Sequence, residues 1–200
     1  TDIFSLNHKN SRRKFRLPRL VCATAMAVLV GNEAQLQAAY PHTVTGSSGA
    51  VAADHELASQ AGAEILAQGG NAVDAAIATA LALGVVQPAG SGLGGGGFLL
   101  LRKADGTVAA LDFREVAPKQ ASRDMFIDSA TGKVVPERSR WGGLAVAVPA
   151  EPAGLAHALR EWGTLKPGQV IGPALRLADK GFPVGKHLAR SPSMVVPKLA

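Results

Sequence analysis

A short charged run, Asp112-Phe113-Arg114-Glu115, holds the side chains of this sequence best suited to chemistry. It follows an apolar segment, Val108–Leu111, with the composition of a strand, and strand ends commonly carry functional side chains. The planar guanidinium of Arg114 suits a carboxylate, whereas Glu115 could accept an ammonium group or hold the arginine in place. Taken alone, a structural ion pair is the better explanation of these two residues.

Six glycines fall within the eight residues from Gly90 to Gly97. The run contains the G-x-G-x-x-G pattern twice, but a dinucleotide site needs a strand before the pattern and a helix after it. Here a predicted helix precedes and a predicted strand follows, so that function is excluded. Backbone without side chains serves either tight packing of a helix on a strand or the lining of a pocket, and both interpretations stay open.

The other polar residues indicate neither a metal site nor a local nucleophile. Cys22 is the only cysteine, and no Ser, Thr or Cys lies beside an identifiable base. We therefore expect no metal, no cofactor and no catalytic residue in this chain. The histidines that lack metal-ligand spacing are His42, His55, His157 and His187.

The elements that must position Arg114 can be placed from the hydrophobic pattern. Ala50–Ala53 is expected to form a short strand, and Asp54 to cap an amphipathic helix that Gly69-Gly70 ends. Asn71 and Asp74 resemble a capping box that opens an uncharged, buried helix over residues 75–86.

A hairpin and two amphipathic helices complete the predicted order. The hairpin strands are Phe98–Leu101 and Val108–Leu111, and the helices lie near Glu151–Trp162 and Val170–Lys180. This order favours a layered α/β (α+β) fold with antiparallel strands over an alternating βαβ sheet.

Composition and charge exclude several classes of protein. The 200 residues are 47% hydrophobic and 18% charged, which excludes a disordered tail. Aromatic residues make up only 4%, too few for stacking on bases. Of the net charge of +6, residues 1–40 carry six basic against two acidic residues. The positive charge is concentrated in this leader, so we expect no nucleic-acid partner.

Residues 1–39 have the order of an export signal. The segment Ser11–Arg16, which holds four basic residues, precedes the apolar run Leu20–Gly31 and small residues at the exit. The run is shorter than the roughly 20 residues of a membrane span, so we expect no permanent anchor. Arg12-Arg13 resembles a twin-arginine signal, with a Sec-type signal or a helix of the mature domain as alternatives. We expect residues 40–48 to be a linker, the mature part to be 49–200, and the protein to be periplasmic or secreted.

Several segments together resemble the gamma-glutamyltranspeptidase family of N-terminal nucleophile hydrolases, in order and with the family's spacing from about Gly49 onward. They are Gly69–Ala76, Gly92–Phe98, Leu111–Pro118, Arg123–Phe126, Ala174–Ala178 and Gly181–Val184.

The resemblance implies a four-layer αββα sandwich, of which this chain is the N-terminal part of the large subunit. In the family a precursor cleaves itself, and the new N-terminal threonine of the small subunit attacks the gamma-glutamyl amide of glutathione and similar compounds. The acyl group then passes to water or to an amino acid or peptide. The chain stops at Ala200 without this threonine, so we expect residues 40–200 alone to be inactive and to need the small subunit as partner.

Within the resemblance, Arg114 matches the family arginine that pairs with the α-carboxylate of the gamma-glutamyl group, and Glu115 is the adjacent family acid. Pro149-Ala150 departs from the Pro-Gly usual in the family. The alternatives are a related acylase, acting on cephalosporins or on poly-gamma-glutamate, and a non-catalytic binding module. A threonine at a self-cleavage site beyond Ala200 would favour the two enzymes over the binding module.

If residues 1–39 are an export signal, they are removed during export. Mass spectrometry of the exported protein should place the mature N-terminus roughly between residues 35 and 48. A folded exported protein that retains residues 1–39 would contradict this assignment.

Overall fold

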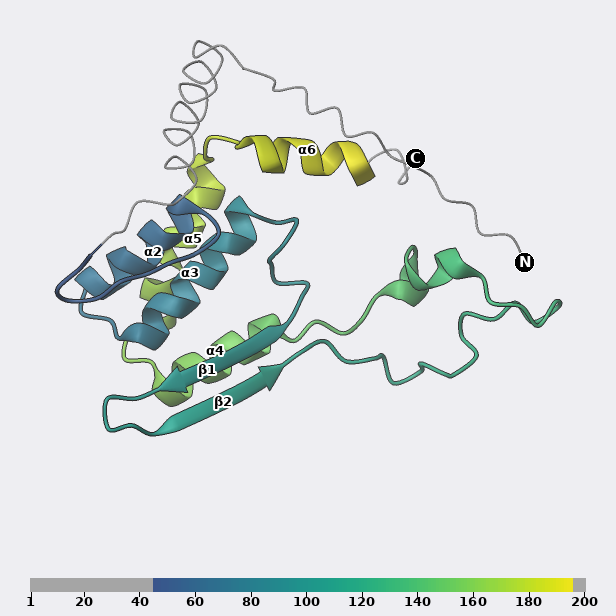
Figure 1. Ribbon diagram of the computed structural model, residues 1–200, viewed down its shortest axis with the longest axis horizontal. Helices are drawn as coiled ribbons and strands as arrows, with labels where there is room; N and C mark the ends of the chain where they lie inside the picture. Colours follow the sequence, from purple (N-terminus) through teal and green to yellow (C-terminus); the bar gives the residue numbers. More distant parts are fainter. Residues whose placement is uncertain (1–44, 196–200) are drawn as a thin grey trace, which may run out of the picture. The chain divides into compact units, whose positions relative to one another are not determined.

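The computed structural model describes residues 45–195 (Figure 1). The predicted export signal, 1–39, and most of the predicted linker, 40–48, lie outside the described residues, so both assignments stay predictions. Helices and an antiparallel hairpin occupy separate segments, which confirms the α+β class. The elements are α2 (Glu56–Ala67), α3 (Ala72–Val86), β1 (Gly97–Arg102), β2 (Val108–Phe113), the 3-10 turns η2 (Pro136–Ser139) and η3 (Gly143–Ala145), α4 (Glu151–Trp162), α5 (Pro167–Lys180) and α6 (Lys186–Val195).

Helix α2 forms as predicted, but the residue that caps it is His55 and not Asp54. His55 Nδ1 accepts a hydrogen bond from the backbone N–H of Leu57 at 3.2 Å. The carboxylate of Asp54 instead accepts from the side chain of Gln87 at 2.8 Å. On its apolar face Ala58, Ala61 and Ile65 are buried, and Gly69 takes a positive φ of 88° just beyond the last turn.

Helix α3 is the central helix, as its uncharged sequence predicts, and it contacts α2, α4 and α5. The predicted capping box is present. Asn71 Oδ1 accepts from the backbone N–H of Asp74 at 3.1 Å, and Asp74 Oδ2 accepts from the backbone N–H of Asn71 at 2.9 Å. Both ends of this helix are therefore defined by local signals, since Gln87-Pro88 follows directly.

The predicted strand Ala50–Ala53 does not form. A strand needs a neighbouring strand to pair its N–H and C=O groups. Within residues 45–195 the sheet consists of β1 and β2 alone. Val51 and Ala53 instead pack against the helical core from an extended segment without regular structure.

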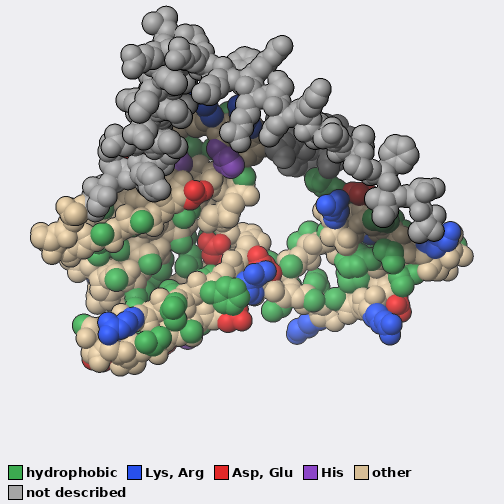
Figure 2. Space-filling view, in the orientation of Figure 1, with side chains coloured by type: hydrophobic (Ala, Val, Ile, Leu, Met, Phe, Trp, Pro, Cys, Tyr) green, Lys and Arg blue, Asp and Glu red, His purple; other side chains and the backbone are tan. Residues whose placement is uncertain are grey.

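The hairpin forms with the predicted strands, each extended slightly, and its two faces differ. Residues Leu99, Leu101, Leu111 and Phe113 pack against the helices and close the core. Phe98, Leu100 and Val108 lie on the opposite, outer face and are 60% to 78% exposed. Figure 2 shows hydrophobic side chains along this face of the hairpin. The sheet thus covers the core with one face only.

The chain after β2 returns to the helices through η2 and η3, and Val116 pairs with Val148 in an isolated antiparallel bridge. Helix α4 begins at Glu151, as predicted, and packs on β2, whereas α5 begins at Pro167, earlier than predicted. Helix α6 was not predicted. Among the described residues, no helix combines the length and the apolar character needed to cross a bilayer.

The carboxylate of Asp74 is fully buried and connects segments that lie far apart in sequence. Besides the Asn71 N–H, it accepts hydrogen bonds from the Thr164 N–H at 3.0 Å, the Thr164 hydroxyl at 2.6 Å and the Leu165 N–H at 3.2 Å. The side chain of Asn71 donates to the carbonyl of Trp162 at 2.7 Å. The start of α3 is thereby joined to the connection between α4 and α5.

Burial by itself would raise the pKa of Asp74, but the hydrogen bonds from Thr164, Asn71 and Leu165 outweigh burial and hold this pKa below its ordinary value. The folded protein therefore prefers the ionised carboxylate. Its contribution to stability is present above the ordinary aspartate pKa and is lost as the pH falls through the lowered pKa of the folded state.

Replacing Asp74 by Asn should lower the free energy of unfolding by roughly 2–4 kcal/mol at neutral pH, because buried donors lose a charged acceptor. Urea unfolding of the purified proteins measures this difference, which should shrink as the solution is acidified. The matched control is Asp179→Asn on the exposed side of α5, with an expected effect within about 0.5 kcal/mol. Equal effects of the two substitutions would contradict the role given to Asp74.

Candidate functional site

Arg114 follows the last residue of β2, as predicted, and its position depends on the packing of Phe113. The ring of Phe113 lies against α4 at Gly154, where a Cβ atom would collide with the ring. The absence of a side chain at Gly154 therefore allows β2 to approach the helix closely. The end of the strand, and with it Arg114, is held against α4.

Arg114 and Glu115 form the ion pair that their adjacency suggests, with 3.1 Å between Nε and Oε2. The guanidinium Cζ also lies 5.7 Å from the centroid of the Phe98 ring. The side chain of Arg114 is 61% exposed and that of Glu115 28%. An exposed guanidinium suits a carboxylate ligand, but the substrate-binding role of both residues stays a prediction.

The glycine run joins α3 to β1, the order that excludes a dinucleotide site. At Gly96 a Cβ atom would collide with the carbonyl oxygen of Phe113, so this position has no room for a side chain. The carbonyl of Gly95 accepts hydrogen bonds from the N–H groups of Ala150 and Glu151, each at 3.0 Å. The run therefore packs tightly between β2 and the start of α4.

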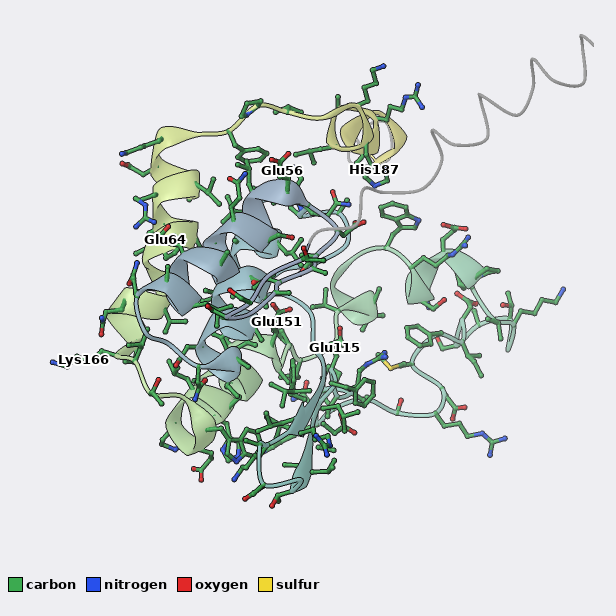
Figure 3. All side chains as sticks on the ribbon, turned by 60° about the vertical axis from the view of Figure 1, so that its left-hand side comes forward. Glu56, Glu64, Glu115, Glu151, Lys166 and His187 are labelled. Atoms are coloured by element: carbon green, nitrogen blue, oxygen red, sulfur yellow. The ribbon has the colours of Figure 1, made fainter. Side chains whose placement is uncertain are left out.

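The same run lines a pocket of about 340 Å³, so the two interpretations of the glycines are both correct. Its charged lining residues are Glu115 and Glu151, which lie near each other where the hairpin meets the helices (Figure 3). Glu151 is only 7% exposed. Glu151 was not predicted as a site residue. The available signal was an acidic side chain in the first turn of a helix, directly after Pro149-Ala150.

The pKa values of the two glutamates are shifted in opposite directions. The pKa of Glu115 is lowered by a hydrogen bond from its own backbone N–H, followed by the charge of Arg114 and the backbone N–H of Gly96. The pKa of Glu151 is raised by burial and by the charge of Glu115, against a hydrogen bond from the backbone of Gly92. The surroundings therefore shift the pKa values of the two carboxyl groups apart.

No group of three or more His, Cys, Asp or Glu side chains within residues 45–195 is arranged to hold a metal ion. His55 caps α2, and Nδ1 of His157 on α4 lies 2.8 Å from Nη2 of Arg160. His42 lies outside the described residues. The site thus offers a guanidinium, two carboxyl groups and backbone N–H groups, a set that suits a ligand with both a carboxylate and an ammonium group.

Replacing Glu151 by Gln should keep an acceptor for the Gly92 N–H and remove the charge beside Glu115. Folding raises the pKa of Glu151. The contribution of this residue to the free energy of unfolding of the wild-type protein therefore falls as the pH rises from the ordinary glutamate pKa to the raised pKa of the folded state. The variant should therefore gain stability relative to wild type over that interval, measured by urea unfolding between about pH 4 and pH 8. Glu161→Gln at the exposed end of α4 controls for loss of a surface charge, and a difference independent of pH would refute the assignment.

Comparison with known proteins identifies relatives across this region. The family model described as gamma-glutamyltranspeptidase matches residues 58–200. Glutathione hydrolase 2 of Arabidopsis thaliana is 46% identical over 146 residues, which are 73% of this chain and 24% of that protein. The glutathione hydrolase proenzyme of Bacillus subtilis strain 168 is 44% identical over 165 residues, 80% of this chain and 28% of the proenzyme. The chain thus spans about a quarter of the length of these relatives.

Solved structures agree with this assignment. The gamma-glutamyltranspeptidase of Helicobacter pylori superimposes with a TM-score of 0.72 and 43% identity, over 77% of this chain and 44% of that one. A cephalosporin acylase of Bacillus halodurans gives a TM-score of 0.65 and 31% identity, over 80% and 31% of the two chains. With the fold of N-terminal nucleophile hydrolases and a family match over most of its length, the chain belongs to the gamma-glutamyltranspeptidase family.

Proposed function

We propose that the full-length protein that carries this chain is a gamma-glutamyltransferase and glutathione hydrolase. It would cleave the gamma-glutamyl amide of glutathione and pass the acyl group to water, an amino acid or a peptide. This chain contributes part of the large subunit, and a small subunit from the same precursor supplies the nucleophile. The export-type order of residues 1–39 supports a periplasmic or secreted location.

The observation that carries this proposal is the identity of 44% and 46% to two glutathione hydrolases over a segment that includes Arg114 and Glu115. Arg114 is exposed and paired with Glu115, which lines the pocket, and this supports a role in ligand binding. A guanidinium whose Nε is already paired with a carboxylate can still bind a second carboxylate through its two Nη groups.

In the proposed mechanism Arg114 binds and orients the donor. Two parallel hydrogen bonds from its Nη groups to the α-carboxylate fix one end of the gamma-glutamyl group. The hydroxyl of the N-terminal threonine of the small subunit then attacks the γ-amide carbon at the other end, and the α-amine of this threonine acts as base. The amide C–N bond breaks, and the leaving amine takes the proton. Water or an acceptor amine then attacks the acyl-enzyme and frees the threonine.

A related acylase of the same fold is the second candidate, and the likeness to a cephalosporin acylase supports it. That structure is 31% identical, against 43% for the gamma-glutamyltranspeptidase structure, so the gamma-glutamyl activity is favoured. Purified full-length protein should separate into two subunits on a denaturing gel and release anilide from a gamma-glutamyl anilide. If the protein cleaves only the acyl side chain of cephalosporins, it is an acylase. If it shows neither activity, it is a binding module.

The isolated segment 40–200 should show no turnover of the gamma-glutamyl anilide, because no candidate nucleophile in it has a neighbouring base. The measurement is the release of anilide by the purified segment beside the full-length enzyme. Turnover by the segment alone would contradict the placement of the nucleophile in the small subunit.

Substituting Arg114 by Lys in the full-length enzyme replaces a planar fork with a point charge. We expect kcat/KM for the gamma-glutamyl anilide to fall by roughly 30- to 1,000-fold, about 2–4 kcal/mol, with self-cleavage retained. The 4-aminobutyryl anilide, which lacks the α-carboxylate, should be turned over almost equally by wild type and variant.

Arg102→Lys is the matched control, because Arg102 lies at the other end of the hairpin and is also exposed. It should leave both donors unaffected. If Arg114→Lys prevents self-cleavage, or reduces turnover of both donors equally, Arg114 is a structural ion-pair residue and the substrate assignment is wrong.

A further inference from the structure

Phe98 is an aromatic residue that packing among the described residues does not explain. It is the second residue of β1, lies on the outer face of the hairpin and is 67% exposed. The contribution of β1 to the core comes from the alternate residues Leu99 and Leu101. The side chain of Phe98 therefore takes no part in packing the hairpin onto the helices.

The ring of Phe98 lies against the guanidinium of Arg114. The distance of 5.7 Å from Cζ to the ring centroid is within the range of cation–π interactions. The strand register explains this contact, because Phe98 pairs with Asp112 and Arg114 follows two residues later. Residues two apart share a face of a strand, so Phe98 and Arg114 are diagonal neighbours.

Glu115 restrains the same guanidinium at a different atom. Its Oε2 accepts the hydrogen bond from Nε of Arg114 at 3.1 Å, and the backbone N–H of Gly96 helps to hold the carboxylate. Within the part of the chain that the structure describes, the hydrogen bonding of this guanidinium involves Nε alone. The two Nη groups, which form the fork that binds a carboxylate, are left for a ligand.

We propose that Phe98 is a positioning residue for Arg114: its ring and the Glu115 carboxylate together hold the guanidinium so that both Nη groups are presented to the α-carboxylate of the donor. This inference rests on the proposed function. The benefit is preorganisation, because a long side chain that is already ordered loses less conformational freedom when the donor binds. Phe98 itself does not touch the donor.

The test uses the full-length enzyme and three variants. Phe98→Leu removes the aromatic face but keeps an apolar side chain, and Phe98→Tyr keeps the face. Leu100→Ala is the matched control, since Leu100 lies two residues further on the same outer face and is 78% exposed. Self-cleavage, KM and kcat are measured for the gamma-glutamyl anilide and for the 4-aminobutyryl anilide.

We expect Phe98→Leu to raise KM for the gamma-glutamyl anilide by about 2- to 10-fold with little change in kcat. It should have almost no effect on the donor without an α-carboxylate, and Phe98→Tyr and Leu100→Ala should resemble wild type. In an Arg114→Lys background, Phe98→Leu should add little, because the fork that it positions is gone.

An active wild type whose KM values are unchanged by Phe98→Leu overturns this inference alone. Equal losses on both donors, failure of Phe98→Leu to self-cleave, or a comparable effect of Leu100→Ala also overturn it, because each indicates a structural role for the outer face. A wild-type enzyme that self-cleaves but turns over no gamma-glutamyl donor overturns the proposed function, and this inference with it.

Discussion

The buried carboxylate of Asp74 is the interaction on which the arrangement of the helices depends. It belongs to the first turn of α3, yet its other partners, Thr164 and Leu165, lie about 90 residues later, between α4 and α5. A buried carboxylate is tolerated only where donors surround it, and here backbone and hydroxyl groups supply them. The same interaction that caps the central helix therefore fixes where α4 ends and α5 begins.

The position of α4 in turn determines the position of the site. Its first N–H groups bind the carbonyl of Gly95, and Gly154 receives the ring of Phe113 at the end of β2. Arg114 is the next residue along the chain. A displacement of α4 would thus reach both the glycine run and the arginine.

Two glutamates at one pocket illustrate how surroundings set the behaviour of identical side chains. Glu115 accepts hydrogen bonds and faces the positive charge of Arg114, so its ionised form is favoured. Glu151 is buried and faces the negative charge of Glu115, and both effects raise its pKa. The two pKa values are thus shifted apart, and Arg114 pairs with the glutamate whose pKa is lowered.

Most local elements could be predicted because their causes lie within a few residues. The capping box of Asn71 and Asp74, the glycine stop after α2 and the hairpin follow from neighbouring side chains, and Arg114 beside Glu115 is visible as a pair. Contacts between distant segments were beyond prediction. Ala50–Ala53 has a strand-like composition but no strand beside it among the described residues, and Glu151 and Phe98 reach the site only through the packing of α4 and the register of the hairpin. Side-chain types and their spacing thus determined the helices and strands. The electrostatics and the geometry of the site depend on burial and on pairing between distant residues, and only the packing of the elements decides these.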